Sequence, residues 1–342
     1  MKNIETSRLI LRPYQETDFA AVHSYASNPE NVTYMLFGPN NEEETRAFLS
    51  FAMGNTAKDP IINYELAVTL KSTGQLIGGC NLATDDDCGA VGWILHKDHW
   101  QQGYGTEIAR ALLTYGFDVL DMRRIIATCC TENHGSYKLM EKLGMRREAT
   151  HQDCRKAREE YEREYYDEYQ YAILKDEWNV QKEVAYYNAL PYRFDDFINV
   201  PTLSDGEISL ICTSKLPGNP EKKLVPMYCF AICKDGEKIG DINLRIGYSD
   251  GLYYGGQIGY AVNEAHRGKN YAVRACKLLI PVAKAHGMTK LLITNNYTNI
   301  PSKRVCEKLG AKLVRLVRLP EWTDLYKDGQ RYENIYEWDI SV

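Results

Sequence analysis

Two stretches of this chain, about 166 residues apart, have nearly the same pattern of residues. Residues 133–144 and 299–310 share six of their twelve positions: Asn, Ser, Glu, Lys, Leu and Gly. Upstream of each lies a second shared pattern, Trp100-Gln-Gln-Gly-Tyr-Gly-Thr106 in one copy and Arg267-Gly-Lys-Asn-Tyr-Ala272 in the other. A repeat of this length predicts two copies of one domain, arranged in tandem.

The length of the chain agrees with this interpretation. At 342 residues it is long for one domain, and each half is large enough to bury a core of its own. We therefore predict an N-terminal domain over residues 1–178 and a C-terminal domain over residues 179–342. The charged segment over residues 175–182 is expected to connect the two.

The charge and composition of the chain limit the kinds of molecule that it is expected to bind. The net charge of −5 and the pI near 5.9 argue against nucleic acid and leave cationic amines open. No apolar run is long enough to span a membrane, and the first residues lack the apolar core of a secretory signal. The ten cysteines have no metal-ligand spacing. We therefore expect free thiols, no bound metal and a reduced, cytoplasmic setting, with disulfides or a metal site as the alternative.

Short apolar strands and amphipathic helices alternate in both halves. In the first half, strands are expected over residues 9–12, 64–70, 76–82, 90–95 and 124–130, and helices over 42–51, 106–118 and 136–143, with another beginning near residue 19. The second half repeats this order, and Pro281 is predicted to kink the helix over residues 271–286. This alternation predicts a mixed-sheet α/β domain in each half.

The glycine-containing pattern in each half joins a strand to a helix, which suits the binding of an anion. Glycine lets the backbone turn with positive φ and approach a ligand closely, and the N–H groups at a helix start attract phosphate. A P-loop is excluded because no Gly-Lys-Ser/Thr follows, and a dinucleotide fingerprint is excluded because its first glycine is missing. A tight strand-to-helix turn without a ligand remains the alternative.

Together, the two patterns resemble those of the GNAT superfamily of acetyl-CoA-dependent N-acetyltransferases. The family loop, Arg/Gln-x-x-Gly-x-Gly/Ala, matches residues 100–105 with Trp100 in first position, and residues 267–272 with Asn270 in fourth. The first half is similar to ribosomal-protein N-terminal acetyltransferases in residues 6–12, 100–107, 133–136 and 167–178. The second half resembles the family more loosely, over residues 238–310. The resemblance implies tandem domains, each with a mostly antiparallel sheet flanked by helices, that pack as an intrachain pseudo-dimer.

The resemblance also implies which residues hold acetyl-CoA. Backbone N–H groups of the loop would bind the pyrophosphate, the strand before it would contact the thioester, and Asn133 and Asn299 would bond the pantetheine arm or cap a helix. The implied residues are Leu95, Gln102, Gly103, Tyr104, Gly105, Thr106 and Asn133 in the first copy, and Val262, Arg267, Gly268, Lys269, Asn270, Tyr271, Ala272 and Asn299 in the second.

The resemblance implies one candidate catalytic residue in each copy, a serine. Ser136 and Ser302 stand where this subgroup has a serine near the sulfur of CoA, although each could simply begin a helix. The tyrosine acid of many relatives is replaced by Met140 and Cys306. No base can be assigned: Glu65, Asp87 and His96 are candidates in the first copy, each with an ordinary surface role as the alternative. The tyrosine-rich residues 161–171 are expected to pack as surface or to line an acceptor pocket.

The function expected from the resemblance is transfer of an acetyl group from acetyl-CoA, as co-substrate, to a primary amine. The acceptor would be a small molecule or a protein N-terminus. The first copy, with both glycines, is expected to be the active half. The alternative is a CoA-binding regulatory or structural tandem in which one or both halves are non-catalytic.

Overall fold

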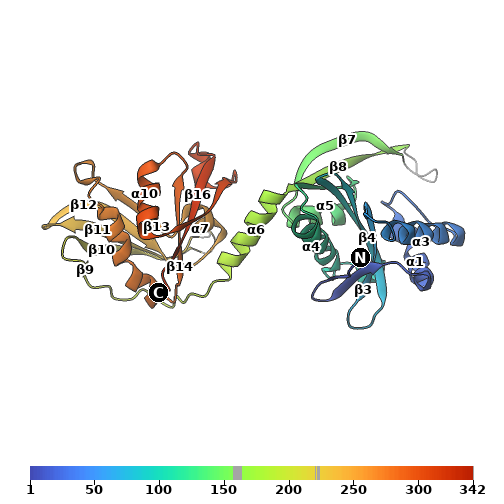
Figure 1. Cartoon of the computed structure of the whole chain (residues 1–342), viewed down its shortest axis with the longest axis horizontal. Coiled ribbons are helices and arrows are strands. Elements are labelled where there is room, and N and C mark those ends of the chain that lie inside the picture. Colours follow the sequence, from blue (N-terminus) through green and yellow to red (C-terminus); the bar gives the residue numbers. More distant parts are fainter. Residues whose placement is uncertain (157–163, 220, 222–223, 342) are drawn as a thin grey trace. The chain divides into compact units, whose positions relative to one another are not determined.

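The computed structural model describes residues 1–156, 164–219, 221 and 224–341 (Figure 1). The chain divides into two compact units, Met1–Asn179 and Val180–Val342, which we call the N-unit and the C-unit. Helix α6 (Lys175–Asn188) contains the boundary between them. The charged stretch near this boundary, which the sequence suggested only as a connection, is therefore helical.

The N-unit is built on one eight-stranded sheet with the strand order β1-β2-β3-β4-β5-β6-β8-β7. Neighbouring strands are antiparallel except for β5 and β6, which are parallel. The strands are β1 (Ile4–Glu5), β2 (Leu9–Pro13), β3 (Asn63–Leu70), β4 (Leu76–Asp85), β5 (Cys88–Leu95), β6 (Arg124–Cys130), β7 (Arg146–Lys156) and β8 (Tyr165–Leu174). This sheet confirms the expected mixed, mostly antiparallel fold class.

Helices cover both faces of this sheet, and Figure 1 shows α1 and α3 on one side of β3 and β4 and α4 on the other. One core cluster joins Tyr25 and Leu49 to Ala67 of β3, and another joins Ile108 and Leu112 to strand residues that include Leu66. The helices are α1 (Phe19–Ala26), α2 (Pro29–Val32), α3 (Glu42–Thr56), α4 (Tyr104–Thr114) and α5 (His134–Lys142), with short 3-10 turns at Glu16–Asp18 and Lys97–His99 and a π turn at Tyr115–Val119. The sequence did not predict α2.

Strands β5 and β6 part after a short stretch of pairing. Residues 88–90 pair with residues 124–126, and no further register between the two strands exists among the described residues. On the other side of β5, the N–H of His96 donates to the carbonyl of Ile77 at 2.8 Å. Because antiparallel pairs alternate in their hydrogen bonding, Trp93 and Leu95 turn their backbone groups away from β4. These groups therefore face the gap between β5 and β6.

The C-unit repeats this plan with two separate sheets. A five-stranded sheet has the order β13-β12-β11-β10-β9, and a three-stranded sheet has the order β14-β16-β15. The strands are β9 (Leu203–Ser204), β10 (Ser209–Leu216), β11 (Met227–Lys234), β12 (Glu237–Arg245), β13 (Ile258–Val262), β14 (Lys290–Asn296), β15 (Lys312–Arg318) and β16 (Tyr332–Asp339). A backbone bond from Gln257 N–H to the carbonyl of Leu292, at 2.8 Å, joins the two sheets beside the start of β13.

The helices of the C-unit are α7 (Asp250–Gly255), α8 (Tyr271–Leu278), α9 (Ile280–Ala285), α10 (Ile300–Leu309) and α11 (Asp324–Lys327). Helices α8 and α10 correspond in order to α4 and α5 of the N-unit, whereas α7 lies between β12 and β13 and has no counterpart between β4 and β5. The break between α8 and α9 confirms the kink predicted at Pro281, which lies in the first turn of α9. Residues 14–62 of the N-unit carry α1, α2 and α3, whereas the described part of residues 217–226, between β10 and β11, forms no helix.

All ten cysteines lie in the described part of the chain and are free thiols. Among the described residues, no helix is both long enough and apolar enough to cross a membrane.

Candidate active site

The loop of the N-unit bends through two residues with positive φ before α4 begins. Gln101 has φ of 57° and Gly103 has φ of 81°, and Gly103 is the N-cap residue of α4, with no side-chain capping bond. The first N–H groups of a helix have no partner within it, so those of Tyr104, Gly105 and Thr106 are available at the helix start. The loop therefore has the form that an anion site requires.

A network of hydrogen bonds ties the start of the chain to this loop. Glu107 accepts bonds from Thr6 Oγ1 (2.5 Å), Ser7 Oγ (3.0 Å) and both the backbone and the Nε of Arg8 (2.8 and 2.7 Å). Burial raises the pKa of Glu107, but these bonds outweigh it and lower the pKa to about 2. The carboxylate is thus always ionised at neutral pH and fixes residues 6–8 beside α4.

Arg8 is the residue of this network that reaches the loop. Its Nη1 donates to the carbonyl of Gln102 at 3.0 Å, and its guanidinium carbon lies 4.3 Å from the ring centroid of Tyr104. The side chain is 45% exposed, so one face of the cation remains open to solvent beside the helix start. The sequence pattern placed residues 6–12 and 100–107 in the same family motif, but it did not predict that they touch.

The C-unit forms the same turn, although Asn270 and Ala272 stand where the N-unit has Gly103 and Gly105. Gly268 has φ of 79°, and Asn270 has φ of 62° and is the N-cap residue of α8. Asparagine adopts this left-handed conformation more readily than most residues, so the backbone turn is kept. The side-chain oxygen of Asn270 accepts a bond from Lys308 Nζ at 2.6 Å.

The first residue of each loop bonds back to the preceding strand. Trp100 Nε1 donates to the carbonyl of Leu95 at 2.8 Å, and Arg267 Nε donates to the carbonyl of Val262 at 3.0 Å. The carbonyl of Leu95 also accepts a bond of 2.6 Å from Asn31 Nδ2. Both carbonyls are therefore hydrogen-bonded within the protein. The N–H groups of Leu95 and Val262 are the backbone groups that face the gap beside each strand.

Asn133 and Asn299 both cap helices. Each side-chain oxygen accepts a bond from the N–H of the serine three residues later, Ser136 at 3.1 Å and Ser302 at 3.2 Å. The helix-cap alternative of the sequence analysis is therefore realised in both units. The cap uses the oxygen of each amide, which leaves the amide nitrogen as a separate donor.

The two candidate serines have different neighbours. Burial raises the pKa of the Cys129 thiol to about 11, against the lowering effect of a hydrogen bond with Ser136. Ser302 Oγ lies 2.9 Å from the hydroxyl of Tyr260, whose pKa burial raises. Tyr260 follows Gly259 as Trp93 follows Gly92, so in the C-unit the serine is bonded to an aromatic residue of the strand that precedes the loop.

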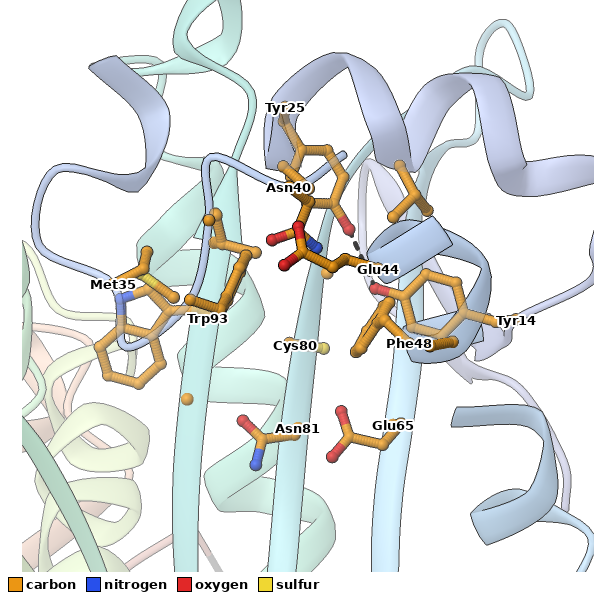
Figure 2. A pocket seen from close by; sticks show the side chains of 18 residues that line it. Tyr14, Tyr25, Met35, Asn40, Glu44, Phe48, Glu65, Cys80, Asn81 and Trp93 are labelled. Atoms are coloured by element: carbon orange, nitrogen blue, oxygen red, sulfur yellow. Dashed lines mark hydrogen bonds between the residues drawn. The ribbon is translucent and has the colours of Figure 1, made fainter. Parts of the chain in front are cut away.

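A cavity of about 500 Å³ lies in the N-unit between the sheet, helices α1 and α3 and the segment that precedes α3 (Figure 2). Strands β3, β4 and β5 form its floor, and β5 contributes Gly92, Trp93 and Ile94. The remaining lining residues come from the first 65 positions and from β4: Tyr14, Val22, Tyr25, Ala26, Met35, Phe37, Gly38, Asn40, Glu44, Ala47, Phe48, Glu65, Gly79, Cys80 and Asn81.

Glu65 is the carboxylate on the floor of this cavity. It lies directly across from Asn81 in the β3–β4 register, and Asn81 lies across from Gly92 in the β4–β5 register. A side chain at Gly92 would come within 2.5 Å of the Asn81 oxygen, so the glycine makes room for the amide. Burial raises the pKa of Glu65 from its usual 4.5 to about 7, which suits a group that exchanges protons at neutral pH.

The other two base candidates are placed less favourably. Asp87 lies in the β4–β5 turn, where an ion pair with Arg123 at 2.6 Å lowers its pKa. His96 follows β5, its N–H is bonded to Ile77, and its Nδ1 lies 3.6 Å from Asp98. Neither lines the cavity, and both fit the surface alternative. Of the tyrosine-rich stretch, residues 161–163 lie outside the described residues, and Tyr165 to Tyr171 belong to β8.

The C-unit has a matching strand framework but no matching carboxylate. Asn243 of β12 lies across from Gly259 of β13, and its oxygen accepts a bond of 3.2 Å from the Gly259 N–H. On its other side, Asn243 lies across from Cys229. Cys229 therefore occupies the place that Glu65 has in the N-unit, and the register of three strands is needed to see this.

Comparisons with known proteins agree with this geometry. A family model described as an acetyltransferase (GNAT) domain matches residues 8–146 and residues 177–312, one match for each copy of the repeat. The two matches together cover well over half of the chain, and they confirm the resemblance seen in the sequence motifs.

Individual relatives match about half of the chain and nearly all of their own length. The uncharacterized N-acetyltransferase YnaD of Bacillus subtilis strain 168 is 35% identical over 179 residues, which are 52% of this chain and 99% of the relative. The uncharacterized N-acetyltransferase p20 of Bacillus licheniformis is 28% identical over 181 residues, which are again 52% of this chain and 99% of the relative. A crystal structure of a GNAT-family acetyltransferase from Bacillus anthracis is 35% identical, covers 52% of this chain and all of its own, and has a TM-score of 0.45.

Proposed function

Because the chain belongs to the acetyltransferase (GNAT) family, we propose that it transfers the acetyl group of acetyl-CoA to the primary amine of a small molecule. We further propose that the N-unit carries the reaction. The observation that supports this most is the position of β5. Its residues 92–94 line the cavity that contains Glu65, while the backbone of Trp93 and Leu95 faces the gap between β5 and β6.

Acetyl-CoA would bind along this gap. The N–H groups of Gly103, Tyr104, Gly105 and Thr106 would hold the diphosphate, since they stand at the start of α4. The exposed guanidinium of Arg8 adds a positive charge next to them. The Leu95 N–H would then face the thioester carbonyl as the donor that stabilises its developing negative charge.

The amine would approach from the cavity on the other side of β5. Its nitrogen attacks the thioester carbon, the C–S bond breaks, and the thiolate leaves. Glu65 takes the proton that the amine must lose, because its pKa of about 7 lets the carboxylate accept a proton near neutral pH. Ser136, at the first turn of α5, is the hydroxyl proposed to donate to the leaving thiolate.

A thiol-release assay with the full chain tests this proposal. We expect acetyl-CoA to bind in a calorimetric titration and CoA to be released only when a primary amine is added. If no binding of acetyl-CoA is detected, the proposal is overturned. Release of CoA at the same rate with and without amine would instead indicate a thioesterase.

A second function, binding of CoA without transfer, is favoured for the C-unit by two observations. Cys229 replaces the carboxylate, and the described residues between β10 and β11 form no helix that could cover the sheet as α1 and α3 do in the N-unit. The loop turn with Asn270 is nevertheless kept. A titration that finds two binding events for CoA, of which only one is lost in a Gly103→Val variant, would support this function.

A further inference from the structure

The charges around the N-unit cavity all have one sign. Glu65 and Glu44 are the carboxylate side chains in its lining, and no lysine, arginine or histidine lines it. All of these lining residues belong to the described part of the chain. Glu65 lies on the floor, and Glu44 lies at the rim, where it also accepts a bond from Asn41 N–H at 2.8 Å. Such a site attracts an ammonium group and disfavours a carboxylate.

The walls of the cavity are mostly apolar. Tyr14 and Phe48 meet edge to face, with ring centroids 5.4 Å apart, and Figure 2 shows both beside the labelled strand residues Cys80 and Glu65. Aliphatic and aromatic side chains form most of the remainder: Val22, Tyr25, Ala26, Met35, Phe37, Ala47, Trp93 and Ile94. Apolar walls of this kind stabilise an apolar body by removing it from water.

Two hydroxyl groups in the cavity are bonded to each other. Tyr14 Oη lies 3.3 Å from Tyr25 Oη, and burial raises the pKa of both phenols, so both stay neutral. A side chain at Gly79 would lie 2.0 Å from Tyr14 Oη, which shows how closely this hydroxyl approaches the sheet. Apart from this pair and the carboxylates of Glu65 and Glu44, the only polar side chains in the lining besides Cys80 and Trp93 are Asn40 and Asn81. A heavily hydroxylated amine, or one with more than two positive charges, would therefore find few polar partners.

The apolar surface continues to the mouth of the cavity. The segment between α2 and α3 supplies Met35 and Phe37 to the lining, and Phe37 is 39% exposed. Asn31 in α2 anchors the start of this segment to β5 through its bond to Leu95. An entering molecule therefore meets apolar side chains before it reaches Glu65.

We infer that the acceptor is a primary amine with an aromatic or branched aliphatic body and no carboxylate. The inference rests on the proposed function, since it assigns the substrate class of the same site. In this arrangement the ammonium group lies against Glu65 and Asn81, and the apolar body fills the space between Tyr14, Phe48 and Phe37. Free amino acids, polyamines and peptide N-termini fit less well.

A panel of amines tests the inference through kcat/KM for acetyl transfer. 2-Phenylethylamine is the reference, phenylalanine adds a carboxylate, ethanolamine removes the apolar body, and spermidine adds charges. We expect phenylalanine to be at least about 100-fold poorer than the reference, because its carboxylate would be buried near Glu65 without a cation. We expect ethanolamine to be about tenfold poorer or worse. A short peptide beginning with serine completes the panel.

The outcomes separate the inference from the function on which it rests. If ethanolamine, spermidine, phenylalanine or the peptide is the best acceptor, the inference is overturned and the acetyltransferase function stands. If acetyl-CoA does not bind, both are overturned. If acetyl-CoA binds but no amine reacts, calorimetric binding of 2-phenylethylamine decides: its absence overturns the inference, and its presence with no binding of phenylalanine supports it.

Two pairs of variants locate the apolar body within the cavity. Ala47→Trp fills the cavity from an exposed position of α3, and Ser50→Trp adds the same side chain at an exposed position of α3 that does not line the cavity. We expect only Ala47→Trp to lower kcat/KM for 2-phenylethylamine, by about tenfold or more, with acetyl-CoA binding unchanged.

The second pair compares neighbouring residues of the segment at the mouth. Phe37→Ala removes a lining ring, whereas Leu36→Ala removes an adjacent side chain that is 80% exposed and does not line the cavity. We expect KM for 2-phenylethylamine to rise about fivefold to tenfold in the first and to stay constant in the second. Equal effects within both pairs would place the amine elsewhere and overturn the inference.

Discussion

The N-unit and the C-unit share the parts that suit CoA and differ in the parts that suit an acceptor. Both have a left-handed turn before the loop helix, at Gly103 and Asn270, and a capping asparagine, at Asn133 and Asn299. In the N-unit, α1 and α3 lie over residues of β3, β4 and β5 and form a cavity, whereas the described residues between β10 and β11 of the C-unit form no helix. The proposed donor site and the proposed acceptor site are therefore formed by different parts of the fold.

Glu65, Asn81 and Gly92 face one another across β3, β4 and β5 and form a row of residues across the sheet. This cross-strand row shows the difference between the two units at the level of single residues. Asn81 and Gly92 have counterparts in Asn243 and Gly259, but the first member of the row is Glu65 in one unit and Cys229 in the other. The asparagine and the glycine are present in both units, but the carboxylate is present only in the N-unit. This difference is the reason that we propose the base in the N-unit.

A third difference concerns charge at the loop. In the N-unit, Arg8 precedes β2 and pairs with Glu107 of α4. In the C-unit the signs are exchanged, because Asp205, which precedes β10, pairs with Arg274 of α8 at 2.7 Å. The cation therefore comes from outside the loop helix in one unit and from the helix itself in the other.

The largest expected effect on activity comes from Glu65, the residue of the cross-strand row that differs between the two units. Glu65→Gln should lower kcat for acetyl transfer by about 100-fold or more, since it removes the proposed base, and acetyl-CoA binding should be unchanged. Cys229→Ala is the matched change in the C-unit and should have no effect on rate. Activity lost in Cys229→Ala but kept in Glu65→Gln would reverse our assignment of the active unit.

The pH dependence sharpens this prediction. The proposed base must be ionised, and the pKa of Glu65 is raised to about 7, so kcat/KM should rise as pH increases through about 7 and level off above it. The residual activity of Glu65→Gln should lack this rise. A wild-type profile that is flat from pH 6 to pH 8 would assign the base to another group.

The next largest effect concerns the loop. Gly103→Val forces a β-branched residue to a φ of 81°, which costs about 1–2 kcal/mol and should weaken acetyl-CoA binding in the N-unit by about tenfold. Asn270→Val creates the same conflict in the C-unit, where φ is 62°. We expect the second change to leave KM for acetyl-CoA in the transfer assay unaltered, and an equal rise in both variants would show that both loops serve the reaction.

A smaller effect is expected on stability, from two carboxylates at matching places in the two units. Glu333 lies across from Asn296 as Glu168 lies across from Cys130. Glu168 faces Arg155 at 3.7 Å, whereas Glu333 is 4% exposed and its Oε2 has no hydrogen-bond partner among the described residues. Burial raises the pKa of Glu333 to about 7, so its contribution to stability is lost as pH rises through 7.

Glu333→Gln should therefore raise the free energy of unfolding at pH 8 by about 1 kcal/mol and flatten the decline in stability between the usual pKa of 4.5 and the raised pKa of about 7. Glu168→Gln breaks a pair instead and should lower stability slightly, by less than about 1 kcal/mol. Thermal denaturation at several pH values measures both. Destabilisation by Glu333→Gln at pH 8 would mean that the carboxylate has a partner in solution.

The smallest expected effect comes from the exchanged ion pair. Arg8→Ala removes a partly exposed cation next to the loop and should weaken acetyl-CoA binding about twofold to fivefold, less at high salt. Arg274→Ala in the C-unit should not change KM for acetyl-CoA. Calorimetric titration at two salt concentrations checks this, and a salt-independent loss would indicate a change of loop structure instead.

Features that depend on residues close together in the chain could be predicted. The capping asparagines, the positive φ at the loop glycine and the kink at Pro281 each depend on a few neighbouring positions, and the structure contains all three. The predicted ends of helices were less accurate, since α5 begins at His134 rather than at the predicted Ser136. A helix end depends on capping geometry, which apolar periodicity does not report.

The sequence by itself determined that the chain contains two copies of one fold and where each copy has its left-handed strand-to-helix turn, because repeats and turns are patterns of neighbouring residues. Only the tertiary structure decided which ionisable group to propose as the base. Glu65 was one of three base candidates, and its selection required the registers of β3, β4 and β5 and the helices that bury it. Burial raises a pKa, and burial is produced by residues far apart in the chain.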